Sequence, residues 1–425
     1  MSEGIKRKVL SLGFFNLIEN VFLRSVNIGS WIFIIRLLHR EDVGIIGLSF
    51  GYLSFLNFIN VAPETMLYRD FPAIKKSKKI NDFISSFLLF SFYKFSVVLV
   101  VSFFISFFLY LSYHSLKISL FFVGISFILT ISFFKSPVKE LLKVDFKQKI
   151  STLIEITLSG ISFIFLISGL YRHPTLSTYI IVYGLMSILG IIIWFSILKR
   201  IYNFKFKSEK AFPLLNYSLN SFSIWNHLNG SITYFIYNID PAILSICGIS
   251  LVTIGNYTTA LKISNFFFFI PMIFQNTLGI AFSNLNHKKS IFLLKKIFLF
   301  NLIFGILQLL LFLYTGRWII ENFFTHKFVS EIFKYSLIII IGITILNITR
   351  PLISWLTIKG NIKKVFFFTY LPTGIAAFPV YLSLTKRYGP TGTAFGNIIL
   401  YSFFSFLLIF WMLWSYFKNE ERDSK

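Results

Sequence analysis

Long uninterrupted apolar segments, separated by short polar ones, recur along the whole chain. The segments 9–35, 83–110, 118–134 and 394–417 approach or exceed the roughly 20 residues that a helix needs to cross a hydrocarbon core about 30 Å thick. Only helices and closed barrels satisfy their own backbone hydrogen bonds in lipid, and a barrel strand would be shorter, with alternating polarity. The pattern therefore predicts an all-α polytopic membrane protein.

Twelve membrane-spanning helices are predicted by this pattern. The first follows Lys6-Arg7-Lys8, as the apolar part of a secretory signal would. It is longer than such a segment and no small-residue cleavage site follows it, so we expect a retained helix. The predicted spans are 9–35, 43–63, 83–110, 118–134, 150–170, 176–198, 213–237, 252–282, 291–314, 332–349, 365–384 and 394–417.

Composition supports the membrane assignment and narrows the chemistry. Of the 425 residues, 56% are apolar and 14% are charged, whereas about 25% of a soluble domain is charged. The single cysteine, Cys247, excludes an internal disulfide. The sequence has no Gly-rich phosphate-binding loop and no cluster with metal-ligand spacing, and the longest predicted external loop is only 316–331. We therefore expect no cofactor, no bound metal and no enzymatic activity.

The distribution of basic residues predicts the orientation. The formal net charge is +24, and the N-terminus, the C-terminus and every second loop together hold 29 Lys or Arg, against 8 in the opposite loops. Short loops rich in Lys and Arg remain cytoplasmic. Both termini are therefore predicted to be cytoplasmic, in a plasma membrane. The basic loops would contact anionic membrane lipids, and we expect no nucleic-acid partner.

Two halves of the sequence resemble each other at a constant offset. Glu41–Gly47 precedes the similar Val252–Tyr257 by about 211 positions, and Ser136-Pro137 precedes Arg350-Pro351 by 214, each proline being interpreted as the end of a helix. Six helices per half is an even number, so the pattern predicts two parallel-repeat six-helix bundles around a central cavity. The predicted divisions are an N-terminal bundle at 1–198, a cytoplasmic linker at 199–212 and a C-terminal bundle at 213–425.

Short motifs between the predicted helices resemble those of a known family. Arg36–Gly44 reads RLLHREDVG and resembles the RLLGPEDFG signature of the polysaccharide biosynthesis proteins, with His-Arg in place of Gly-Pro. These are the O-antigen-type flippases of the multidrug/oligosaccharidyl-lipid/polysaccharide (MOP) exporter superfamily. Further motifs similar to the family's, in the same order, are Ile239–Leu244, Gly255–Ala260, Lys359–Asn361 and Tyr388–Ala394.

The resemblance implies a transporter. Such proteins move a polyprenyl-pyrophosphate-linked oligosaccharide from the cytoplasmic to the outer leaflet of the bacterial inner membrane during the assembly of surface polysaccharide, such as the O-antigen of lipopolysaccharide. Their partners would be this lipid-linked substrate, membrane lipids, and the polysaccharide polymerase and chain-length machinery. The residues explain why a protein is needed, because moving a charged headgroup through hydrocarbon without polar partners is prohibitively costly.

Polar residues within the spans are the predicted walls of a substrate passage. On the first helix they recur at spacings of 4, 4 and 3 and share one face. Arg24 lies roughly 22 Å from the inner end of this helix, where an arginine facing lipid would be costly. The predicted passage residues are Asn16, Asn20, Arg24, Asn27, Lys94, Asn216, Asn220, His227 and Lys262.

Each of these residues also has a purely structural interpretation. Arg24 and Lys94 would then pair with the intramembrane acids Glu19 or Glu155, or with a carbonyl at a helix end, and hold the bundle together. The asparagines would join neighbouring helices, and Lys262 would extend its ammonium toward the membrane surface. His227 is more typical of a satisfied polar residue than of a proton site.

Three other functions remain open. A multidrug or organic-cation exporter of the same fold should have an acidic passage, whereas the span centres hold three cations, Arg24, Lys94 and Lys262, against two carboxylates. A lipid II flippase would handle a similar anionic lipid carrier. A membrane-embedded polysaccharide polymerase or glycosyltransferase normally needs a sizeable external loop.

Overall fold

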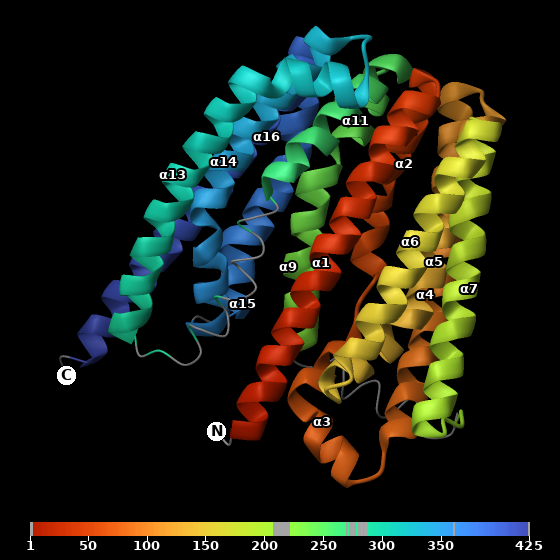
Figure 1. Ribbon diagram of the computed structural model, residues 1–425. Coiled ribbons are helices and arrows are strands. Elements are labelled where there is room, and N and C mark those ends of the chain that lie inside the picture. Colours follow the sequence, from red (N-terminus) through yellow and green to blue (C-terminus); the bar gives the residue numbers. More distant parts are fainter. Residues whose placement is uncertain are drawn as a thin grey trace. The chain divides into compact units, whose positions relative to one another are not determined.

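The computed structural model describes residues 3–206, 222–268, 287–359 and 362–423, with isolated positions between 269 and 286. Every regular element in these segments is helical, and nine of them are long and apolar enough to cross a membrane (Figure 1). The last of these contains two helices that meet at Gly389, whose φ is 61°. The shorter α9 and α11 correspond to two further predicted segments. The all-α, multi-pass prediction is confirmed.

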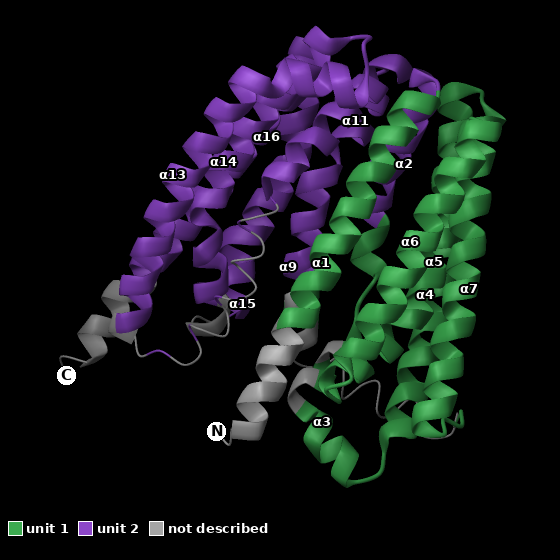
Figure 2. Cartoon of the chain, viewed as in Figure 1, with its two compact units in different colours: residues 1–38, 56–227 green, residues 39–55, 228–425 purple. Residues whose placement is uncertain are grey.

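The first of two compact units comprises residues 1–38 and 56–227 (Figure 2). Within it, α4 packs on α5, α5 packs on α7, and α1 packs along α6. Its described elements are α1 (Glu3–Leu37), η1 (Asn57–Ile59), η2 (Pro63–Met66), α3 (Leu67–Lys76), α4 (Ile80–Tyr113), α5 (Leu116–Val144), α6 (Gln148–Arg172) and α7 (Leu176–Tyr202).

The second unit comprises residues 39–55 and 228–425 (Figure 2). Nearly all of α2 therefore belongs to this unit, although it follows α1 in the chain. The part of the predicted linker 199–212 that follows residue 206 lies outside the described residues. The elements are α2 (Arg40–Leu56), α9 (Phe222–Asn238), α10 (Asp240–Ile246), α11 (Leu251–Ser264), η3 (Asn265–Phe268), α13 (His287–Ile319), η4 (Ile320–Phe324), α14 (Val329–Lys359), α15 (Ile362–Val365), η5 (Phe366–Tyr370) and α16 (Leu371–Asp423).

Two prolines that the sequence analysis placed at helix ends lie inside helices. The interpretation of Ser136-Pro137 and Arg350-Pro351 as termini is wrong, because α5 and α14 each continue for about two more turns. The predicted polar loops 135–149 and 350–364 are correspondingly too long. Several basic residues counted as loop residues are therefore helical.

The carbonyl groups exposed by these prolines explain why the helices continue. A proline in a helix deprives the carbonyl four residues earlier of its N–H donor. In α5 that carbonyl belongs to Phe133, and the Ser91 hydroxyl of α4 donates to it at 3.1 Å. In α14 it belongs to Asn347, and the side-chain amide of Asn301 in α13 donates to it at 2.9 Å. A polar side chain from a neighbouring helix thus replaces the lost donor in both halves.

Two glycines allow α2 and α11 to cross at close range. A Cβ atom on Gly44 would collide with the carbonyl oxygen of Leu251, and one on Gly255 would collide with that of Arg40. Leu251 follows Arg40 by 211 positions, and Gly255 follows Gly44 by the same number. The contact is therefore reciprocal, with equivalent residues of the two sequence halves on its two sides. The offset predicted from sequence reappears as a local pseudo-twofold contact.

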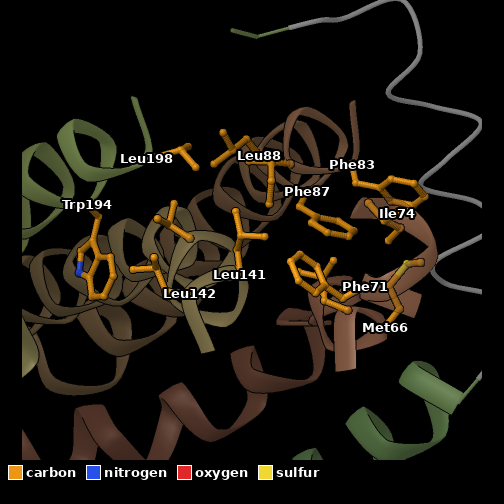
Figure 3. Close-up of a cluster of buried hydrophobic side chains, with 13 residues drawn as sticks. Met66, Phe71, Ile74, Phe83, Phe87, Leu88, Leu141, Leu142, Trp194 and Leu198 are labelled. Atoms are coloured by element: carbon orange, nitrogen blue, oxygen red, sulfur yellow. The ribbon is translucent and has the colours of Figure 1, made fainter. Parts of the chain in front are cut away.

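A compact apolar cluster fixes α3 against the rest of the first unit (Figure 3). Phe71 and Ile74 of α3 are buried against Phe83 and Phe87 of α4 and Leu141 of α5. The apolar residues of α3 thus face the unit, and its lysines remain on the outside. The result is a short amphipathic helix held by its apolar face.

Candidate functional site

The helix α1 uses one of its faces to pack within the first unit. Glu19 and Ser30 are buried on this face, with exposed fractions of 6% and 3%. Gly29 lies against the ring of Phe163, where an added Cβ would be 3.0 Å from a ring carbon. The small residue lets α1 and α6 approach closely, as is usual for helices packed in membranes.

The rest of α1 is divided between an apolar and a polar face. Phe14, Leu17 and Val21 are exposed on the apolar face. The polar face lies about a third of a turn from both of the others. It carries the four polar residues predicted to share one face of this helix, which we call the stripe. Asn20 and Asn27 are exposed, and Asn16 and Arg24 are half-buried.

This arrangement limits what the stripe can be facing. It is not a dry contact inside the bundle, because Asn20 and Asn27 remain exposed. Hydrocarbon is an unfavourable environment for Arg24 and two exposed amides, and α1 has a separate apolar face to turn toward lipid. Glu19, the one carboxylate among the described side chains of α1, lies on the packed face. The polar face is thus suited to a water-filled environment and an anionic ligand.

The two predicted charge partners lie together in the first unit. Lys139 of α5 is within 2.8 Å of Glu19 and 3.4 Å of Glu155, and Lys135 is 3.6 Å from Glu155. Both carboxylates are buried, with exposed side-chain fractions of 7% and 8%. A buried charge left without a partner would be strongly destabilising. This ion network joins α1, α5 and α6 through two lysines that the sequence analysis had placed in a loop.

A glutamine connects this network to the polar face of α1. The side-chain amide of Gln148 donates to Asn16 Oδ1 at 3.0 Å and to Glu19 Oε2 at 2.9 Å. The Thr152 hydroxyl donates to the same oxygen of Glu19 at 3.0 Å. Asn16 is therefore held by α6. These bonds fix the rotation of α1 and with it the direction of the stripe.

Lys94 lies deep within the first unit and has an exposed fraction of 3%. Its ammonium group donates to the Val61 carbonyl at 2.8 Å and to Asn60 Oδ1 at 3.3 Å. It also lies 4.8 Å from the centre of the Phe133 ring. Residues 60–62 are not helical, so Lys94 satisfies a carbonyl that has no helical partner.

Two more polar residues contact the same irregular segment. A ring nitrogen of His227 lies 3.0 Å from the Phe58 carbonyl. The Ser136 hydroxyl donates to the buried carboxylate of Glu64 at 2.5 Å. The structure thus brings Lys94 and His227 to one broken segment after α2, where their recorded contacts hold the backbone.

The remaining predicted residues belong to the second unit or lie outside the description. Lys262 is half-buried, with its ammonium 4.9 Å from the centre of the Phe50 ring. Asn216 and Asn220 lie outside the described residues. The assignment of all nine residues to a passage stays a prediction.

A buried carboxylate in the second unit was missed as a site by sequence reasoning. Asp240 Oδ2 accepts hydrogen bonds from the Tyr257 hydroxyl at 2.8 Å and the Asn397 amide at 2.7 Å. The Tyr381 hydroxyl donates to Asn397 Oδ1 at 2.9 Å. Asp240 Oδ1 has no hydrogen-bond partner among the described residues. Such a group, held by neutral donors, can take up or release a proton.

Two intramembrane cations were missed by sequence reasoning for the same reason. Lys139 and Arg350 follow or precede a proline that was interpreted as a helix end, so neither was considered an intramembrane cation. Arg350 is buried, 4.5 Å from the centre of the Phe268 ring. Asp240 was noted as part of a motif, and its position as the lone acid of an apolar stretch was an available signal.

Comparison with known proteins finds similarity in structure and not in sequence. No protein-family model matches the chain, and no curated protein matches it. The eukaryotic MATE transporter AtDTX14 superposes with a TM-score of 0.67 at 13% identity, over 97% of this chain and 96% of that one. An inward-facing multidrug resistance MATE family transporter of the MOP superfamily gives 0.67 at 13% identity, over 96% and 99%.

The lipid II flippase MurJ, in an inward closed conformation, is also similar. Its TM-score is 0.55 at 16% identity, over 95% of this chain and 87% of that one. At such low identity, the likeness concerns the fold alone. The chain therefore has the fold shared by the MATE transporters and MurJ.

Proposed function

We propose that this protein flips a polyprenyl-pyrophosphate-linked oligosaccharide from the cytoplasmic to the outer leaflet of a bacterial inner membrane, during surface polysaccharide assembly. The observation that carries the proposal is the polar face of α1. It exposes Asn20 and Asn27 beside Arg24 on a membrane helix that has separate faces for packing and for lipid. The fold shared with transporters and a lipid II flippase supports translocation as the activity.

The chemistry of this face suits the proposed substrate. A guanidinium group can hold two phosphate oxygens at once, which a lysine cannot do. Side-chain amides both donate and accept hydrogen bonds, as sugar hydroxyls require. The neighbouring apolar face of α1 would let the polyprenyl chain remain in lipid while the headgroup crosses. Arg24, Asn16, Asn20 and Asn27 are therefore the proposed headgroup contacts in the first unit.

The sign of the charge separates this proposal from drug export. An organic-cation exporter of this fold would need an acidic passage. The carboxylates of Glu19 and Glu155 are instead occupied by Lys139 and Lys135 on the packed side of α1. An anionic carrier is therefore favoured. Lipid II has the same pyrophosphate chemistry and is the competing substrate within this class.

The test is a complementation experiment in a strain that lacks the chromosomal copy. Arg24→Ala should abolish surface polysaccharide while membrane protein level stays normal. Arg24→Lys should restore part of it, because the charge is kept and the planar fork is lost. Ser25→Ala is the matched control, since Ser25 is exposed next to Arg24 and its hydroxyl donates to the Val21 carbonyl within α1.

Two outcomes would contradict the proposal. Full polysaccharide production by Arg24→Ala would reject the headgroup role of Arg24. Rescue of a strain depleted of its lipid II flippase, with no effect on surface polysaccharide, would instead assign lipid II as the substrate. Protein level, measured in every strain, distinguishes a lost activity from a lost protein.

A further inference from the structure

One buried carboxylate joins three turns at the same end of the first unit. Asp145 Oδ1 accepts from Lys75 Nζ at 2.6 Å, and Oδ2 accepts from Lys147 Nζ at 2.6 Å and from the Tyr202 hydroxyl at 2.9 Å. Burial alone would raise the pKa of Asp145, but hydrogen bonds from Lys147, Lys75 and Tyr202 outweigh it and lower the pKa. An ionised Asp145 therefore ties α3, the α5–α6 turn and the end of α7 together.

These three turns form a surface that we call the basic platform. Its parts are the described segments 72–80, 143–150 and 199–206, and none of them contains an exposed carboxylate, because Asp145 is enclosed by its donors. The positive charge is therefore concentrated on a rigid surface. Its exposed basic residues are Lys75, Lys76, Lys78, Lys79, Lys149, Lys199, Arg200 and Lys205.

The basic platform lies at a membrane boundary by the position of its helices. The candidate spans α4 and α6 begin at Ile80 and Gln148, and the span α7 ends at Tyr202. The amphipathic α3 is fixed beside them by its buried apolar side chains (Figure 3). Lysines flanking apolar spans are where lipid headgroups are found.

An aromatic side chain projects from the same surface. Phe146 adopts a left-handed backbone with φ 58° and is 50% exposed. A bulky residue is uncommon in this conformation, which favours glycine or asparagine. Its neighbours in the chain are Asp145, which its donors enclose, and Lys147. Rings in such positions anchor proteins at the membrane interface.

We propose that the basic platform binds the anionic headgroup of a membrane phospholipid. The phosphate would contact Lys78 and Lys79, and Phe146 would enter the acyl region beside it. Positive charge without exposed carboxylates favours an anionic lipid over a zwitterionic one. The exposed ring at the end of the spans favours a lipid over a soluble anion. The site uses no residue of the proposed passage, so it can be tested separately from the transport function.

The experiment measures binding of fluorescent phosphatidylglycerol to the purified full-length protein in detergent. Phosphatidylcholine with the same acyl chains is the reference lipid. The wild-type protein should prefer phosphatidylglycerol, and Lys78→Gln/Lys79→Gln should weaken that binding by about tenfold while phosphatidylcholine binding is unchanged. The matched control is Arg172→Gln/Lys386→Gln, which removes two exposed charges that do not belong to the platform.

A second variant tests the aromatic anchor without endangering the fold. Phe146→Asn replaces the ring with a residue that suits the left-handed backbone, so melting temperature should be kept or raised. Binding of phosphatidylglycerol should fall several-fold, whereas competition by inorganic phosphate should be as weak as in the wild-type protein.

Three results would overturn the inference. Equal losses in the platform and control variants would mean that general charge attraction explains the binding. Unchanged phosphatidylglycerol affinity in Lys78→Gln/Lys79→Gln would remove the site. Displacement of the lipid by inorganic phosphate at matching concentration would show an anion site with no lipid preference.

Discussion

Individual residues show where the chemistry of the spans could and could not be anticipated. Glu19 and Glu155 were recognised from sequence as intramembrane acids that need partners. Their partner Lys139 was missed because the proline before it was interpreted as a helix end. The Ser91 hydroxyl that keeps this helix continuous comes from another helix, 42 positions before the carbonyl it serves. Such a tertiary contact leaves no periodic trace in the sequence.

The ion network leads to a prediction about stability. Lys139→Met would leave Glu155 with the more distant Lys135, and Glu19 with the neutral donors Gln148 and Thr152. We expect a loss of roughly 3–5 kcal/mol in the free energy of unfolding, as for other broken buried pairs. The thermal melting of purified protein in detergent would report this loss.

A control variant distinguishes the loss of a buried ion pair from the loss of a lysine charge in general. Lys149→Met removes an exposed lysine at the start of α6 and should change stability by no more than about 0.5 kcal/mol. Adding Glu19→Gln to Lys139→Met should recover part of the loss, because it removes one of the unmatched charges. If Lys139→Met melts like the wild-type protein, the network does not stabilise the bundle.

At the scale of helices, the spacing of polar residues predicted which of them share a face, but not what each face contacts. The intervals within the α1 stripe predicted a common face, and the structure has these residues on one side of the helix. Spacing alone could not tell which of the remaining faces packs and which meets lipid, because Glu19 lies on the packed face although it is charged. The break after α2 was also missed, since residues 57–62 continue an apolar stretch.

The close crossing of α2 and α11 gives a second stability prediction. Gly44→Ala would place a methyl group against the Leu251 carbonyl, and neither backbone can move without moving its helix. We expect a loss of about 1–3 kcal/mol, the usual range for overpacking. Melting curves of Gly44→Ala and Gly255→Ala should fall similarly, because the contact is reciprocal.

Gly184, which has open space where a Cβ would lie, provides the control for Gly44→Ala. Nothing lies within 4 Å of a Cβ on Gly184 in the middle of α7. Gly184→Ala should therefore leave stability unchanged or raise it by up to about 1 kcal/mol, since alanine is the better helix former. Equal destabilisation by Gly44→Ala and Gly184→Ala would argue against the close crossing.

For the whole molecule, helix number and class were predictable because the bilayer imposes a length on every span. The residues at which helices end were less predictable, because α5 and α14 continue as helix through polar residues that were predicted to be loops. The basic residues that leave the predicted loops as a result are Lys135, Lys139, Lys143, Arg350 and Lys359. Most of the asymmetry of 29 against 8 basic residues does not depend on these residues, so the orientation prediction is unaffected.

The orientation can be measured directly. A Cys247→Ser background has no other cysteine, so single cysteines can be introduced at Ser77 and Ser112, near opposite ends of α4. An impermeant maleimide added to intact cells should label position 112 and leave position 77 unlabelled until the membrane is permeabilised. Labelling of position 77 from outside would reverse the predicted topology.

The reciprocal glycine contact has a consequence for the ancestry of the chain. If the two halves descend from one gene, their forerunner was a six-helix protein whose α2 met the same helix of a second copy. Each substitution at that position would have altered both sides of a two-fold interface at once. Such an interface tolerates few residue types, and after gene fusion each side became free to change alone. Gly44 and Gly255, both still glycine, would then be remnants of a homodimer.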